Sequence, residues 1–216
     1  MLHILGEKNS LFNQFLSELR DEEVQLDRMR FRRNLERIGE IFAYELSKEL
    51  KYEEKKVTTP LGVATMNLLS EQPVIATILR AGLPFHQGFL NYFDQADNGF
   101  ISAYRKYEKN EKFDIRIDYM SCPELENRVL VLNDVMLASG LSVVKAYKEL
   151  LSHGKPSHIH VAAVLASVEG VELLKKSLPS KNVSLWIGAI DDELTAKSYI
   201  VPGLGDAGDL AYGTKI

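Results

Sequence analysis

The sequence predicts an α/β fold with a mostly parallel sheet and helices on both of its faces. From residue 73 onward, short apolar runs alternate with segments of helical periodicity, which is the order typical of β-α-β units. The apolar runs are nearly continuous, which indicates strands buried on both faces. The expected strands are Val74–Leu79, Phe100–Tyr104, Arg128–Asn133, Ile159–Leu165 and Val183–Ile190, and the expected helices are Leu83–Phe93, Ser142–His153 and Val168–Leu178.

A long helix and a hairpin are expected before this sheet. From Leu26 to Leu50, apolar residues recur at three- and four-residue steps with Arg and Glu between them, which predicts an amphipathic helix. Two short β-prone runs follow within Lys55–Thr65, around a turn that contains Pro and Gly. Because this hairpin stands outside the β-α alternation, we expect a β-arm that grips a partner subunit in a homodimer or a larger homo-oligomer.

The stretch from Lys106 to Asn127 interrupts the alternation with many charged residues. It is too long and too polar for an ordinary connection, and long loops in compact domains are often lids. One interpretation is a solvated β-ribbon, and the other is a mobile flap over an active site. We expect one domain over residues 1–216, with helices and arm in 1–72, a core sheet in 73–190 that carries the flap 106–127, and a small hood in 191–216.

The composition excludes several classes of function. The chain of 216 residues has a net charge of −4 with both signs interspersed, so we expect no nucleic-acid partner. The single cysteine, Cys122, allows neither an intrachain disulfide nor a cysteine metal cluster. No apolar run approaches membrane-spanning length and the N-terminus lacks a signal-peptide layout, so we expect a cytoplasmic protein with no membrane partner. No directly bound metal is predicted.

The strongest indication of chemistry lies between Val129 and Ser142. A buried strand is expected to end at Asp134, followed by a short loop of small and hydroxyl residues and then a helix. Backbone N–H groups at a helix start, with the Ser139 and Ser142 hydroxyls beside them, form a natural phosphate cradle. Asp134 is expected at the carboxyl edge of the sheet, where open α/β sheets bind ligands. A ribose 5-phosphate fits this combination, because its hydroxyls can face the acid.

Two further motifs point to a diphosphate and a base. Arg80 follows the first strand of the sheet, and a guanidinium there can hold a pyrophosphate through its fork of donors. The alternative is that Arg80 pairs with a nearby carboxylate. The segment Tyr199–Asp209 contains three glycines and a proline, so its backbone can approach a ligand and pair with the edge of a pyrimidine.

The central motif resembles the signature of type I phosphoribosyltransferases that binds 5-phosphoribosyl 1-diphosphate (PRPP). With the other two motifs, the chain resembles the uracil phosphoribosyltransferase family over nearly its whole length. The resemblance also includes Arg30-Phe31-Arg32, Tyr104-Arg105, Val168-Glu169-Gly170 and Tyr212-Gly213-Thr214-Lys215. It implies a type I phosphoribosyltransferase-like fold with a small hood, and the transfer of phosphoribosyl from PRPP to uracil, giving UMP and pyrophosphate in pyrimidine salvage.

The resemblance also assigns roles to residues. Arg80 and Arg105 would bind the pyrophosphate and act in catalysis with Asp134, while Mg²⁺ would enter as the PRPP complex. The ribose and its 5-phosphate would contact Asp134, Val135, Met136, Leu137, Ala138, Ser139, Gly140, Leu141 and Ser142. Uracil would meet backbone groups of Ile200, Gly205 and Ala207, and Asp206 beside it would reach toward PRPP.

The chain departs from the family pattern at two places. Leu141 replaces the second glycine of the usual Asp-Pro-Met-Leu-Ala-Thr-Gly-Gly-Ser, which is harmless only if φ is negative there. Lys106 follows the Tyr-Arg pair where the family usually has an acid or an amide, which bears on closure of the flap. Two alternatives therefore stay open: a phosphoribosyltransferase for another base, and a non-catalytic regulator that binds PRPP or a nucleotide.

Overall fold

A seven-stranded sheet forms the centre of the computed structural model, which describes residues 1–107 and 113–215, and side chains outside 105–114. Six of its described strands are parallel, and β6 alone runs antiparallel to its neighbour β5. The order is β1 (Leu2–Ile4), β9 (Val183–Asp191), β8 (His158–Ser167), β7 (Val129–Leu137), β4 (Val74–Leu79), β5 (Asp97–Tyr107) and β6 (Phe113–Ser121). The predicted mostly parallel α/β sheet is confirmed.

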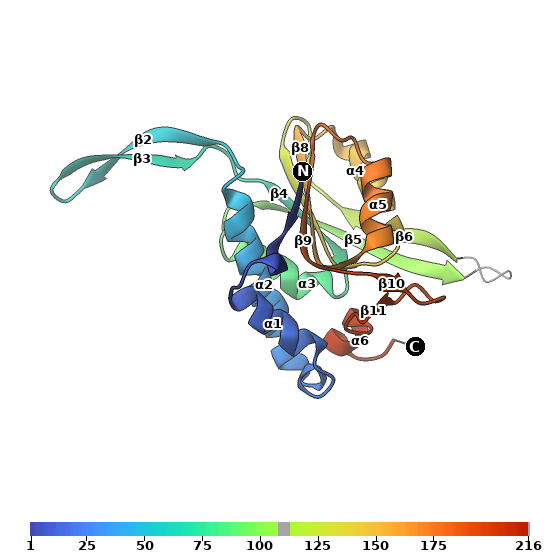
Figure 1. Ribbon diagram of the computed structural model, residues 1–216. Helices are drawn as coiled ribbons and strands as arrows, with labels where there is room; N and C mark the ends of the chain where they lie inside the picture. The colour runs from blue at the N-terminus through green and yellow to red at the C-terminus, as the bar shows by residue number, and fades with distance from the viewer. Residues whose placement is uncertain (108–112, 216) are drawn as a thin grey trace.

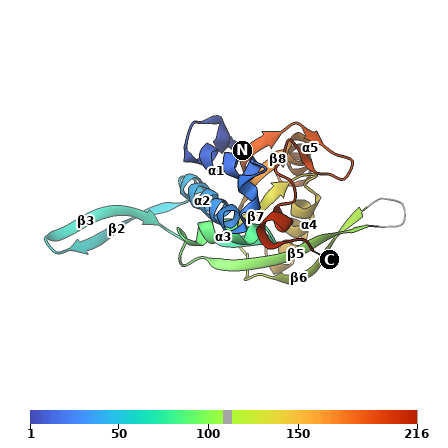
Figure 2. The ribbon, with the colours of Figure 1, turned by 90° about the horizontal axis from the view of Figure 1, so that it is seen from below.

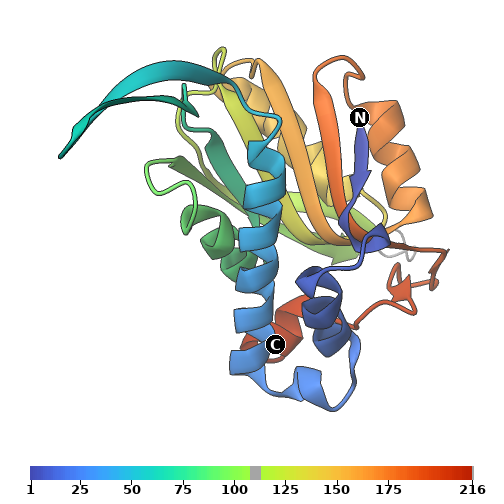
Figure 3. The same ribbon diagram turned by 60° about the vertical axis from the view of Figure 1, so that its left-hand side comes forward.

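Helices cover both faces of the sheet, as predicted (Figures 1 and 3). One face packs against α1 (Leu11–Arg20), α2 (Arg28–Ser47) and α3 (Gly82–Leu90), and the other against α4 (Leu141–Leu150) and α5 (Val168–Ser177). On the first face Phe42 meets Phe85 edge-on, with ring centroids 5.1 Å apart. Burying one such ring stabilises the fold by about 1.5–3 kcal/mol.

A pair of glycines sets the position of α3. A Cβ added at Gly39 of α2 would lie 2.2 Å from the Phe85 carbonyl oxygen, and one at Gly88 of α3 would lie 2.1 Å from the Glu36 carbonyl oxygen. The two helices therefore cross closer than any side chain at these positions allows. This close packing fixes the start of α3, and with it the turn that follows β4.

The predicted hairpin exists and is longer than the sequence suggested. Strands β2 (Tyr52–Thr59) and β3 (Gly62–Leu69) pair over their whole length and project from the body of the molecule (Figures 1 and 2). Every residue of β2 is exposed. The arm also exposes apolar side chains, with Leu61 100% and Val63 66% exposed.

The charge-rich stretch is a ribbon where the structure describes it. β5 and β6 pair antiparallel from Phe100 opposite Ser121 to Tyr107 opposite Phe113, so the expected strand at Phe100–Tyr104 is longer at both ends. Residues 108–112 of the predicted flap lie outside the described residues. The described part fits the β-ribbon interpretation, and closure over a site stays a prediction.

Short elements complete the chain. The 3-10 helices η1 (Leu5–Glu7), η2 (Val24–Leu26) and η3 (Leu151–His153) join longer elements, and β10 (Glu193–Leu194), β11 (Ile200–Val201) and α6 (Ala207–Tyr212) follow the sheet. These last three lie beside the carboxyl edge of the sheet, below β9 in Figure 1. Within the described residues, no helix is long and apolar enough to cross a membrane.

Candidate active site

The motifs predicted to bind PRPP meet at one edge of the sheet. Thr77 of β4 stands opposite Asn133 of β7 in a parallel ladder, so the end of β4 lies beside the second half of β7. Arg80 comes directly after β4, and Asp134 comes directly after Asn133. The carboxyl ends of parallel strands are where ligands bind in open α/β sheets.

Strand β7 is longer than expected, which corrects the predicted phosphate loop. Met136 pairs with Leu165 and Leu137 with Ala166, so the ladder with β8 continues past Asp134 to Leu137. Apolar side chains after the acid keep the strand buried, which is why it does not end at the acid. The loop itself is only Ala138–Gly140. Asp134 is half-buried, and its Oδ1 accepts a hydrogen bond from the Val135 N–H at 2.7 Å.

The short loop is clamped against the start of α5. The Ser167 hydroxyl donates to the Ala138 carbonyl oxygen at 2.6 Å and accepts from the Gly170 N–H at 2.9 Å. A Cβ at Gly170 would lie 2.3 Å from the same carbonyl oxygen, so only glycine admits this approach. Ser167 was not among the predicted site residues. The sequence does indicate it, because a serine three residues before a glycine, where a strand gives way to a helix, is typical of an N-cap.

The start of α4 has the form that an anion site requires. Gly140 is its N-cap with φ of 77°, and within the described chain no side chain caps this helix. First-turn N–H groups are thereby available to a bound phosphate, beside Ser139 and Ser142. Leu141 is the first helical residue and is 41% exposed, and it is not among the described residues with positive φ. The condition under which leucine is tolerated there is met.

Arg80 is held by the C-terminal segment. Its Nη2 pairs with Asp209 Oδ1 at 2.7 Å, and its Nη1 donates to the Gly213 carbonyl oxygen at 3.2 Å. The carboxylate pairing weighed from the sequence is therefore present. A Cβ at Gly208 would lie 3.3 Å from Arg80 Nη2 and 3.2 Å from Asp206 Oδ1. The side chains of Arg80 and Asp206 therefore both lie next to Gly208.

The other predicted arginine is described only in its backbone. Arg105 lies in β5 opposite Ile115 of β6, in the ribbon that runs beside β4. Its side chain lies outside the described part of the chain. Its assignment to the pyrophosphate stays a prediction.

The segment expected to meet the base forms a tight turn and a short helix. The Val201–Pro202 peptide bond is cis, and Gly205 has φ of 92°. The side chains of Ile200 and Ala207 are buried, which leaves this turn to present its backbone. Asp206 caps α6 by accepting a hydrogen bond from the Asp209 N–H at 3.0 Å.

A buried ion pair that sequence reasoning missed anchors this turn. Arg20 donates to both carboxylate oxygens of Asp191, at 2.7 and 2.8 Å, and to the Gly203 carbonyl oxygen at 3.0 Å. The Gly203 N–H donates to Asp191 at 2.9 Å. Burial alone would raise the pKa of Asp191, but the hydrogen bonds from Arg20 and Gly203 outweigh it and lower that pKa.

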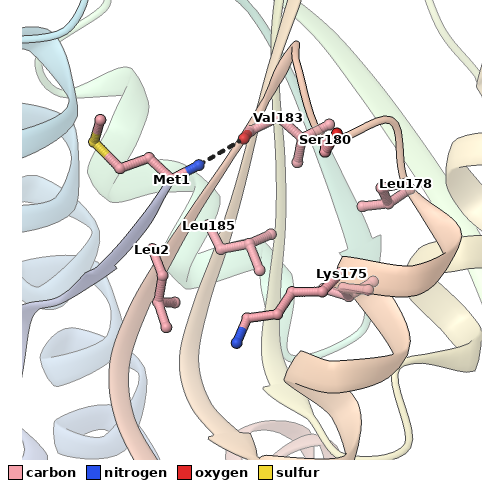
Figure 4. Close-up of a pocket in the computed structure, with 8 residues that line it drawn as sticks. Met1, Leu2, Lys175, Leu178, Ser180, Val183 and Leu185 are labelled. Carbon is pink, nitrogen blue, oxygen red and sulfur yellow. Dashed lines mark hydrogen bonds between the residues drawn. The ribbon is translucent and has the colours of Figure 1, made fainter.

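Two hollows differ sharply in their suitability for a phosphorylated sugar. One, of about 360 Å³, lies between the segment before α2 and the C-terminal segment and is lined by Gln25, Leu26, Arg28, Leu204, Gly205, Asp206, Asp209, Leu210 and Thr214. The other, of about 220 Å³, lies where β9 begins, at the opposite end of the sheet from the phosphate loop (Figure 4). Its lining is mainly apolar and does not suit a diphosphate.

No protein cluster for a metal ion is present in the described chain, because its His, Cys, Asp and Glu side chains form no suitable group of three or more. The parallel sheet, the clamped loop at the start of α4 and the adjacent acid and arginine are the features of a type I phosphoribosyltransferase.

Comparisons with known proteins identify the branch. The family model described as uracil phosphoribosyltransferase matches residues 7–214, and the chain belongs to that family. A uracil phosphoribosyltransferase of Porphyromonas gingivalis is 53% identical over 212 residues, which cover 98% of each chain. One from Pyrococcus furiosus is 37% identical and covers 94% of this chain and 86% of its own. The solved AQ2163 protein of Aquifex aeolicus matches all of both chains, with a TM-score of 0.87 and 32% identity.

Proposed function

We propose that this chain is an enzyme that transfers the 5-phosphoribosyl group from PRPP to uracil and releases pyrophosphate, forming UMP for pyrimidine salvage. The observation that carries the proposal is the clamped Ala138–Gly140 loop at the uncapped start of α4, beside Asp134, in a member of this family. This arrangement supplies phosphate donors and a carboxylate at one edge of the sheet.

The phosphoribosyl end binds along β7 and α4. First-turn N–H groups of α4 and the hydroxyls of Ser139 and Ser142 hold the 5-phosphate. The hydrogen bond from Ser167 to Ala138 keeps the loop in place when the phosphate binds. Asp134 lies beside the ribose. Positive charge develops on the sugar as the bond from C1 to the diphosphate oxygen breaks, and the carboxylate stabilises it.

The diphosphate end binds at Arg80 and Arg105. Arg80 already lies at the carboxyl edge of the sheet, and its pairing with Asp209 holds the guanidinium there before the substrate arrives. PRPP then replaces part of this pairing, because a diphosphate offers more charge than one carboxylate. PRPP and water would supply most ligands of Mg²⁺, and Asp134 is the acid of the phosphate motif that could contact it. A bound Mg²⁺ would offset the charge of the leaving pyrophosphate.

Uracil binds against the backbone of Ile200, Gly205 and Ala207, beside Asp206. The base nitrogen then bonds to C1 of the ribose from the side opposite the departing pyrophosphate, the bond from C1 to the diphosphate oxygen breaks, and the proton of that nitrogen passes to the released pyrophosphate or to water. The ribbon of β5 and β6 is the element that excludes water during this step, since water would otherwise hydrolyse PRPP. Strand β6 lies within the stretch 106–127 that the sequence marks as a flap.

The enzyme acts as a homodimer joined through the arm of β2 and β3. This proposal rests on a hairpin that projects from the body and exposes apolar side chains, among them Leu61 and Val63. Contiguous exposed apolar surface on a soluble protein marks interaction sites. Sedimentation of the purified chain measures the state directly.

The decisive measurement is UMP formation from uracil and PRPP with Mg²⁺. We expect product from the wild type, and a loss of turnover on the order of 10²–10³-fold for Asp134→Asn, which keeps the shape but removes the charge. Asp94→Asn, an exposed residue outside the motif, is the matched control and should retain full activity. PRPP binding without product would point to another base or to a regulator, and no PRPP binding would refute the proposal.

A further inference from the structure

A buried polar cluster lies directly beneath the turn that carries Arg80. Thr77 of β4 and Asn133 of β7 face each other in the sheet, and both side chains are fully buried. His86 of α3 packs above them and is 1% exposed, and Asn98 of β5 lies against its ring. Polar side chains are seldom buried without partners, so this cluster requires an explanation.

Hydrogen bonds fix the orientation of the cluster step by step. The Asn98 amide Nδ2 donates to the Ala96 carbonyl oxygen at 2.9 Å, so its Oδ1 is the acceptor that faces His86 Nε2 at 2.7 Å. His86 Nε2 therefore carries a proton. Burial lowers the pKa of His86 although the bond to Asn98 opposes this, so the ring is neutral and Nδ1 is an acceptor. That nitrogen faces Asn133 Nδ2 at 3.5 Å, which leaves the Asn133 oxygen pointing away from His86.

The oxygen of Asn133 faces the turn after β4. A Cβ added at Gly82 would lie 2.3 Å from Thr77 Oγ1 and 3.7 Å from Asn133 Oδ1. Both atoms are buried, and neither has a hydrogen-bond partner within the described part of the chain. Two polar atoms thus converge on the backbone two residues after Arg80, where glycine alone permits such an approach.

We propose that His86 is a positioning residue for the phosphoribosyl transfer, acting through Asn133 on the two segments that meet PRPP. The inference rests on the proposed function. Asn133 precedes Asp134 in the chain, and its Oδ1 faces Gly82 at the start of α3. Its amide therefore lies between the strand that carries the acid and the segment that follows Arg80. His86 and Asn98 select one of the two amide orientations. Displacement of reacting groups by about 1 Å can cost on the order of 10²-fold in rate.

The test compares His86→Leu, Asn133→Leu and the double variant by calorimetric PRPP–Mg²⁺ binding and by kcat and KM. We expect each single variant to weaken PRPP binding by about tenfold or more, with KM for uracil within about twofold. The double variant should bind no worse than Asn133→Leu alone, because His86 acts through Asn133. His86→Gln can donate to Asn98 and accept from Asn133, so it should recover much of the PRPP binding. If His86→Leu does not fold, His86→Gln takes its place in the comparison.

A purely structural role predicts different results, and His160→Leu provides the matched control. His160 is also buried and also accepts a hydrogen bond, from Trp186, but it lies in β8 away from the Arg80 turn. It should lose thermal stability without losing PRPP affinity. If His86→Leu weakens PRPP binding no more than this control, or if the two losses add in the double variant, the inference is wrong. A wild type that binds no PRPP would instead refute the proposed function.

Discussion

Asp191 is a single buried carboxylate that joins three distant parts of the chain. It ends β9, pairs with Arg20 of α1 and accepts the N–H of Gly203 in the turn expected to meet the base. Removing the carboxylate leaves the Arg20 guanidinium, which is 24% exposed, without its charge partner, so the expected cost is at the low end of the range for buried pairs, about 3 kcal/mol. The same residue therefore links the stability of the fold to the position of the C-terminal turn.

We expect Asp191→Asn to lower the free energy of unfolding by about 3 kcal/mol and to raise KM for uracil more than KM for PRPP. The amide keeps the size of the side chain but loses the charge that opposes Arg20. Because the folded-state pKa of Asp191 is lowered, its stabilisation is full above the unfolded pKa of about 4 and is lost as pH falls further. Urea unfolding at pH 7 and steady-state kinetics measure both effects.

Asp192→Asn is the neighbouring control, since Asp192 is exposed. It should leave unfolding and both KM values unchanged. Equal behaviour of the two variants would mean that the Asp191 pair does not anchor the turn.

At the scale of elements, the β2–β3 arm forms a two-stranded sheet apart from the central sheet and exposes Leu61 in its turn and Val63 in β3. Its stability as a lone ribbon is marginal, because isolated two-stranded hairpins bury little surface. We therefore expect a partner subunit to supply the missing contacts.

We expect a variant with both Leu61→Asp and Val63→Asp to sediment as a monomer where the wild type sediments as a dimer. Two charges in place of these exposed apolar side chains oppose burial at an interface. Leu11→Asp, at a position that is 69% exposed on α1, is the control and should stay dimeric. A double variant that remains a dimer would place the interface elsewhere.

The elements also show what a sequence can reveal. The core strands were predictable because their apolar runs are continuous, and the phosphate loop because Ser139 and Gly140 precede a helical pattern. The end of β7 was not, because Val135–Leu137 reads equally well as a strand or as a loop beside a ligand. β1 has only three residues and is held by its parallel partner β9. Its pairing depends on tertiary contact that no local pattern records.

Some residues of the candidate site were likewise predictable from the sequence and others were not. Arg80 follows the last residue of β4 and Asp134 lies in the second half of β7, where position along the chain predicts position in the sheet. The partners Arg20 and Asp191 are 171 residues apart, and neither belongs to a local motif. Sequence periodicity carries no information about such a pair, so only the fold could reveal it.

At the scale of the whole molecule, buried histidines tie the stability of the fold to pH. Burial, reinforced by nearby His158, His3 and the N-terminal ammonium, lowers the pKa of His160 to about 3. The unfolded chain takes up a proton near pH 6.5 that the folded chain does not. The contribution of neutral His160 to the free energy of unfolding is therefore complete above about pH 6.5, and it decreases as the pH falls from there to about 3. Lowered pKa values of His86 and His158 act in the same direction.

We expect the free energy of unfolding to fall between pH 7.5 and 5.5, with a limiting slope of about 1.4 kcal/mol per pH unit for each such histidine. His160→Asn keeps an acceptor for the Trp186 N–H and removes the titration, so its slope should be smaller. Urea unfolding at several pH values gives these slopes, and an unchanged slope in His160→Asn would contradict the assignment.

The contacts that close the molecule have a consequence for its synthesis. Three arginines from the first part of the chain form hydrogen bonds with residues between 191 and 213: Arg20, Arg32 and Arg80. These arginines are synthesised before their partners, so the contacts form only after the C-terminal segment has been made. Folding during translation proceeds from the N-terminal side. The sheet and its phosphate loop can form while the last segment is still inside the ribosome. A nascent chain whose residues beyond about 190 are still inside the ribosome would thus carry the folded sheet and the proposed phosphate loop without the segment proposed to bind the base. We expect it to gain activity only after its release.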